Sequence, residues 1–156
     1  MEKFLEYIQE ASKITRIIDH MLYVTYPLVK DTKILVKILT EAKKATAYCI
    51  NAILQYEYLY KRIKLYSDAK TNLRTFIEKC APKYSINQSE IKQVLELFEL
   101  AEAHKKSPFE FAKGNKVVIL SENMKQNTIT LEKTKEFLIL TKNILQKTQK
   151  TIISQK

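Results

Sequence analysis

The chain has 156 residues, 46% of them apolar and 28% charged, which is enough apolar content for one folded domain over residues 1–156. Its single glycine argues against hairpin-rich β folds, P-loops and dinucleotide fingerprints, which need several glycines. Two cysteines, at positions 49 and 80, exclude a disulfide framework. No apolar run approaches the ~18 residues of a membrane span, and the acidic start lacks a signal peptide's apolar region. We therefore expect a cytoplasmic protein with no membrane association.

The net charge of +10 is unevenly distributed along the chain. Residues 31–84 hold eleven basic and five acidic side chains, and residues 112–156 hold nine and three. The segment between them is acidic. Lysines far outnumber the three arginines, and lysine is a hydrated point charge rather than a bidentate fork. The basic blocks suggest an anionic partner, although an AT-rich genome would also produce a lysine-rich, glycine-poor composition.

Residues 2–23 predict the first helix, because their apolar positions alternate spacings of four and three. Thr25-Tyr26-Pro27 is expected to end it, since the residue before a proline is pushed away from helical dihedrals. Asp31 is a candidate N-cap for the next helix.

A long helix over residues 33–66 is the most informative element, since it contains neither glycine nor proline. Its apolar seam alternates spacings of three and four for more than four heptads. The middle of the seam is small, which permits close approach of another helix: Ala42, Ala45, Cys49 and Ala52. We expect this helix to be the centre of the fold.

Two further helices follow. One covers residues 68–80 and can be capped by Asp68, and the next runs from Asn87, in capping-box spacing with Glu90, to about Lys105. The apolar residues expected on the buried face of the second helix are Ile91, Val94, Leu95, Phe98 and Ala101. Ser107-Pro108 predicts a short capped helical turn that extends to Phe111. Gly114 is expected to interrupt the secondary structure after it.

Residues 116–131 change to β-branched runs around a polar connection, which resembles a small hairpin. The alternative is that the second run is only the entry to the last helix. That helix covers about 131–153, with Thr134, Thr141 and Thr148 in its apolar stripe. The predicted fold class is mainly α. We expect an antiparallel bundle of four or five helices around 33–66, with the hairpin as an option before the last helix.

Catalytic and metal-ligating patterns are missing from the sequence. His20 and His104 have no ligand cluster around them, so we predict no metal and no cofactor. The row Glu96, Glu99 and Glu102 lacks the histidines of a diiron bundle and indicates a solvated acidic face. Cys49 is expected to be buried, and Cys80, near a helix end, to be a more exposed thiol.

Arg16 and His20 lie four apart on the first predicted helix and face the same side. The pair resembles the R-x4-6-H motif of the HEPN ribonucleases, which are helical bundles. Only three residues separate the two here, so the family is not assigned. The favoured interpretation of Arg16 and His20 is a solvated polar pair at a helix edge. A ribonuclease that uses them ranks third, behind the two functional hypotheses given below.

Aromatic and basic residues alternate near the end of the long helix. Single-stranded nucleic-acid sites combine cations for phosphates with rings on which bases stack. The candidate nucleic-acid-binding residues are Lys37, Lys44, Tyr58, Lys61, Arg62 and Lys64. The competing interpretation is that Tyr56, Tyr60 and Tyr66 are core residues and that the lysines only solvate the surface.

The preferred functional hypothesis is a non-enzymatic basic binding protein for RNA or a ribonucleoprotein surface. The alternative is a scaffold for protein–protein interaction or a small-oligomer subunit. Such a protein would dock a partner, or a second copy, on the long seam or the acidic 90–110 helix.

Overall fold

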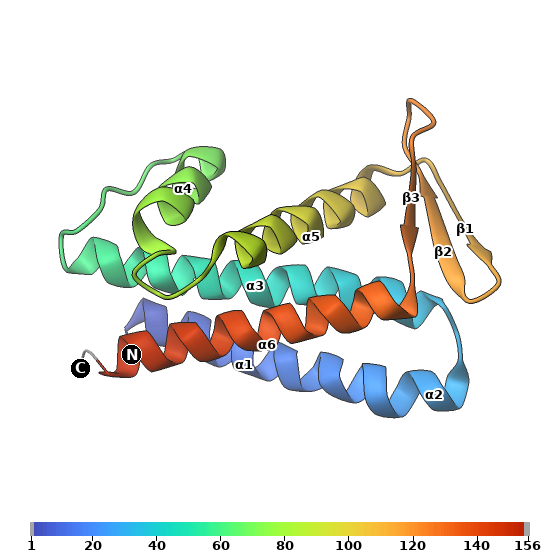
Figure 1. Ribbon diagram of the computed structural model, residues 1–156, viewed down its shortest axis with the longest axis horizontal. Coiled ribbons are helices and arrows are strands. Elements are labelled where there is room, and N and C mark those ends of the chain that lie inside the picture. The colour runs from blue at the N-terminus through green and yellow to red at the C-terminus, as the bar shows by residue number, and fades with distance from the viewer. Residues whose placement is uncertain (1, 155–156) are drawn as a thin grey trace.

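The structure, a computed structural model, describes residues 2–154. Three long helices lie side by side along the molecule, and a fourth crosses their upper side in Figure 1. They are α1 (Lys3–His20), α3 (Lys33–Leu59), α6 (Leu131–Ser154) and, across them, α5 (Gln88–Lys106). A small antiparallel sheet stands at one end, before α6. The predicted mainly α class is confirmed.

The central place of α3 is also confirmed. It packs against α1, α5 and α6, and the small residues of its seam, from Ala42 to Ala52, are fully buried. Phe4 of α1 meets Tyr56, with ring centroids 5.0 Å apart, while Tyr7 meets Tyr48, so α1 runs antiparallel to α3. On the other side α6 runs parallel to α3 (Figure 1).

The long helix ends at Leu59 rather than at residue 66, so the predicted boundary is wrong. Lys61 takes a left-handed conformation (φ 59°), and its N–H donates to the carbonyl of Tyr58. The N–H of Arg62 donates to the carbonyl of Glu57, 3.0 Å away. This pair of bonds is the Schellman arrangement that satisfies the last carbonyls of a helix. The apolar pattern runs past the end because Ile63 is still buried beyond the turn.

The expected break before Pro27 is wrong as well. A π-helical turn, η1 (Met21–Thr25), leads from α1 into α2 (Tyr26–Val29), and Tyr26 stays helical (φ −60°, ψ −45°). Pro27 lies in the first turn of α2, directly after the π-helical turn. The chain leaves the helix only at Lys30, which is left-handed. Asp31 then accepts from the N–H of Lys33, but it lies one residue before Thr32, which is the N-cap of α3 and has no side-chain cap.

The middle of the chain contains α4 (Ala69–Thr75), the π-helical turn η2 (Phe76–Cys80) and α5. Asp68 caps α4, and the Asn87–Glu90 capping box begins α5, so both predicted starts are confirmed. The predicted face of α5 is rotated, since Leu95 is exposed and Leu97 is buried. The buried stripe is Glu90, Ile91, Val94, Leu97 and Leu100. It has the helical period of the predicted stripe, but its later members lie one residue earlier in the sequence.

The sheet has three antiparallel strands in the order β1 (Phe109–Lys113), β2 (Lys116–Leu120) and β3 (Gln126–Ile129). β2 and β3 form the predicted hairpin, but the helical turn predicted at 107–111 is wrong. Ser107 donates to the carbonyl of Leu120, 2.7 Å away, which joins this segment to β2. Gly114 (φ 64°) closes a two-residue turn between β1 and β2, the loop length that hairpins prefer.

The last helix, α6, follows β3 directly and agrees with the prediction. Its threonines Thr134, Thr141 and Thr148 are buried, and each hydroxyl donates to the carbonyl four residues earlier. The oxygen of Thr141 also lies 3.3 Å from that of Thr46 on α3. Since the single proton of Thr141 is used within α6, Thr46 donates across the interface.

Candidate functional site

The end of α3 and the turn that follows it, residues 58–66, present tyrosines and lysines to solvent, and we call this segment the tyrosine turn. Tyr58, Tyr60 and Tyr66 are 47%, 54% and 49% exposed. Lys61 and Lys64, between them, are exposed as well. Tyr56 is a core residue, but the competing interpretation that Tyr60 and Tyr66 are also core residues is wrong. The aromatic surface is larger than the sequence indicated.

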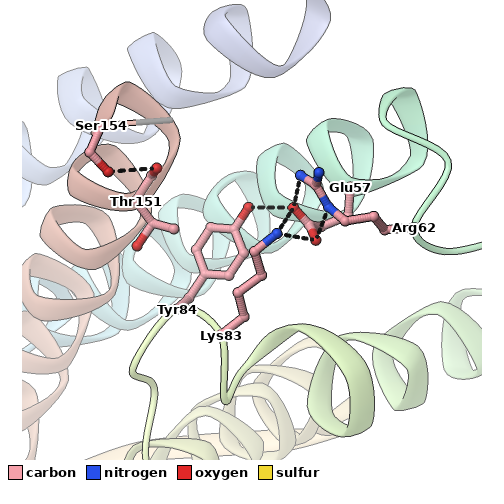
Figure 2. Close-up of polar contacts among 6 residues, drawn as sticks. All are labelled: Glu57, Arg62, Lys83, Tyr84, Thr151 and Ser154. Carbon is pink, nitrogen blue, oxygen red and sulfur yellow. Dashed lines mark hydrogen bonds and ion pairs between the residues drawn. The ribbon is translucent and has the colours of Figure 1, made fainter. Parts of the chain in front are cut away.

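A buried carboxylate fixes the tyrosine turn to the bundle. Glu57 is only 2% exposed, and Arg62 binds it in bidentate fashion, with Nε 2.9 Å from Oε1 and Nη2 2.8 Å from Oε2. Figure 2 shows Lys83 and Tyr84 approaching the same carboxylate from the loop before α5, each with a contact of 3.1 Å. Four donor atoms from three residues therefore surround Glu57.

The electrostatics of this cluster fix its charge states. Burial alone would raise the pKa of Glu57, but hydrogen bonds from Arg62 and Lys83 outweigh that effect and hold the pKa below its usual value. Hydrogen bonding to Glu57 raises the pKa of Arg62, while burial and the nearby carboxylate raise the pKa of Tyr84. A carboxylate stabilised in this way is a poor general base. The cluster therefore orients the turn rather than transferring protons.

Arg62 is already engaged within the protein. Besides binding Glu57, its guanidinium lies 5.0 Å from the ring centroid of Tyr60 and 5.6 Å from that of Tyr56. Its side chain is 38% exposed. A nucleic-acid contact by Arg62 remains a prediction, and its place in the free protein is that of a residue holding the turn.

Lys37 and Lys44 lie on the solvent side of α3, away from the turn. Lys37 pairs with Glu41 at 3.4 Å, and Lys44 is exposed. Along a helix, the fourteen positions from Lys44 to Tyr58 correspond to roughly 21 Å. The structure thus brings Tyr58, Lys61 and Lys64 together and places the other two lysines farther along the rod.

The residues considered for catalysis do not come together. Arg16 and His20 are both exposed, and within residues 2–154 no hydrogen bond or ion pair engages either side chain. Cys80 is buried, so the expectation of a more exposed thiol is wrong. Burial raises the pKa of Cys49 to about 12 and that of Cys80 to about 11, whereas a nucleophilic cysteine needs a lowered pKa.

The acidic row on α5 borders an open groove of about 920 Å³ against β3 and the start of α6. Two of its three carboxylates pair with neighbouring lysines: Glu96 with Lys133, and Glu102 with Lys106. In the part of the chain that the structure describes, no cluster of three or more histidine, cysteine or carboxylate side chains could hold a metal ion.

Glu57, Lys83 and Tyr84 are the residues that sequence reasoning missed. Lys83 and Tyr84 follow Glu57 by 26 and 27 positions, across α4, so no local spacing links them to it. The only signal in the sequence is an acid within an otherwise apolar helix face, one position after Tyr56.

No known protein family, curated protein or solved structure matches this chain, so the function is argued from the site itself. Among residues 2–154, no helix has both the length and the apolar character to cross a membrane.

Proposed function

We propose that this protein is a non-enzymatic, cytoplasmic binding protein for single-stranded RNA, free or exposed on a ribonucleoprotein. The tyrosine turn carries the proposal, because half-exposed tyrosines alternate there with exposed lysines on a fixed backbone. Each base stacked on an aromatic ring contributes about 1–3 kcal/mol, and lysines supply the salt-dependent attraction to phosphates.

The surroundings of the turn support an anionic partner. From residue 61 to residue 83 the chain has seven basic and two acidic residues. Both acids lie in or beside the α4–η2 segment, and Asp68 is occupied in capping α4. A negatively charged strand would therefore meet excess positive charge on both sides of Tyr66.

Replacement of Tyr58 tests the proposal. Tyr58→Ala should weaken binding of a fluorescently labelled single-stranded RNA by about 1–3 kcal/mol, because one stacking surface is lost. Tyr58→Phe should bind like the parent, since the ring remains. Fluorescence anisotropy measures both affinities.

Tyr23 provides the matched control, because it is 51% exposed and belongs to η1. The segment from η1 to α2 lies at the other end of α3 from the tyrosine turn (Figure 1). Tyr23→Ala should leave the affinity unchanged. Equal affinities for Tyr58→Ala and the parent would show that the tyrosine turn binds no bases.

A protein-interaction scaffold is the second candidate, favoured by an apolar surface on the end of α1 and the two helical turns that follow. Five large apolar side chains between residues 17 and 29 are at least 45% exposed: Ile17, Tyr23, Val24, Leu28 and Val29. Exposed apolar patches of this kind mark interfaces. Light scattering would reveal a homo-oligomer, and Leu28→Asp should then dissociate it.

A further inference from the structure

The outer face of the sheet is a second aromatic and basic surface. In the antiparallel register Phe109 pairs with Leu120, Phe111 with Val118, and Lys113 with Lys116, so these six side chains share one face. Gln126 and Thr128 of β3 join the same face. The opposite face carries Val117, Ile119 and Ile129 into the core. The first face is the more exposed of the two, although its Val118 is buried.

Two phenylalanines dominate this outer face. Phe109 is 58% exposed and Phe111 is 38% exposed, and their ring centroids lie 5.6 Å apart. Val118, directly opposite Phe111, is buried although it lies outside the main core cluster. Phenylalanine has no polar atom to hydrate, so the part of each ring that stays exposed forgoes the free energy of its burial.

The positive charge of this face favours an anionic partner. Lys113 and Lys116 stand opposite one another beside the Gly114 turn, and both are exposed. None of the eight outer positions is acidic, and Glu110 lies on the other face, where it pairs with His104. A face with π surfaces, cations and no carboxylates is complementary to an anionic polymer with unstacked bases.

We propose that the outer face of the sheet is a second binding site for single-stranded RNA, in which Phe109 and Phe111 stack bases and the two lysines contact phosphates. This inference rests on the proposed function. The sheet and the tyrosine turn lie near opposite ends of α3 (Figure 1). At the helical rise, its 27 residues correspond to roughly 40 Å. A strand that reaches both surfaces would gain affinity through effective concentration.

The test compares two replacements of the same rings. The double variant Phe109→Leu/Phe111→Leu keeps apolar side chains but removes both π faces. It should bind a labelled oligouridine at least tenfold more weakly than the parent. Phe109→Tyr/Phe111→Tyr keeps the π faces and should bind like the parent. Ile139→Ala, at a 54% exposed position of α6 outside the proposed surfaces, is the matched control, and thermal melting verifies that each variant is folded.

The outcomes separate the two sites. If the parent binds no single-stranded RNA, both proposals fail. If Tyr58→Ala weakens binding but the leucine variant binds like the parent, only the sheet site fails. If the leucine variant weakens binding but Tyr58→Ala binds like the parent, the sheet site is supported and the tyrosine turn is not a binding site. A parent that is dimeric, and that the leucine substitutions make monomeric without changing RNA affinity, would identify the face as an interface between copies and overturn the inference.

Discussion

Glu57 is a single buried residue that holds the exposed tyrosine turn in place. A charged side chain in a helix interface is costly unless its oxygens are satisfied, and here three residues satisfy them. The same contacts hold Arg62 and hence the exposed tyrosines around it. Arg62→Lys would keep the charge but lose the bidentate fork, so it would loosen the turn whether or not Arg62 contacts a ligand.

Glu57→Gln should lower the free energy of unfolding by about 1–3 kcal/mol, because Arg62 and Lys83 lose their charged partner. The loss falls short of that for a fully buried ion pair, since about one third of each cationic side chain is exposed to solvent. Urea denaturation at neutral pH measures the difference. Glu99→Gln, on the exposed side of α5, should leave the stability unchanged.

The same carboxylate makes stability depend on pH. The pKa of Glu57 is below its ordinary value of 4.5 in the folded protein, so the unfolded chain binds the proton more readily. Its contribution is complete above pH about 4.5 and is lost as the pH falls through the folded value. Denaturation curves between about pH 3 and pH 7 should show a smaller loss of stability in acid for Glu57→Gln than for the parent. Equal acid dependence in both proteins would contradict the assignment.

At the scale of the elements, the small seam of α3 sets how closely its neighbours approach. Ala45 and Ala52 are fully buried. Replacing either with leucine should destabilise the protein by about 1–3 kcal/mol through overpacking. Asn51→Leu, on the exposed side of the same helix, controls for the effect of leucine itself. If Ala45→Leu and Ala52→Leu both melt at the same temperature as the parent, the seam does not lie in a packed interface.

Helices were easier to predict than the places where the chain turns. The period of apolar residues identified α3 and α6 because their packing follows the local repeat, and caps such as Asn87 with Glu90 act within four positions. The structure of β1 depends on pairing with β2, and the continuation through Pro27 depends on a π-helical turn. The Glu57 cluster likewise depends on contacts between distant positions, which no local pattern displays.

At the scale of the whole molecule, the proposed binding should depend steeply on salt. If several phosphates are neutralised, affinity for single-stranded RNA should fall by orders of magnitude between about 50 and 200 mM salt. Lys61→Ala and Lys64→Ala should each reduce the slope of log K against log salt by about one phosphate contact. Lys92→Ala, on the exposed side of α5, should not. Salt-independent binding would exclude a phosphate-based interface.

The parallel placement of α6 beside α3 has a consequence for synthesis on the ribosome. Thr46 of α3 contacts Thr141 of α6, 95 positions later, and α6 packs against both α1 and α3. These two helices therefore lack that packing until α6 has been synthesised. During that interval the apolar side of α3 facing α6 is open to water and to other nascent chains. We therefore expect a ribosome stalled before residue 131 to hold a helical pair with an exposed apolar face, which is prone to aggregation.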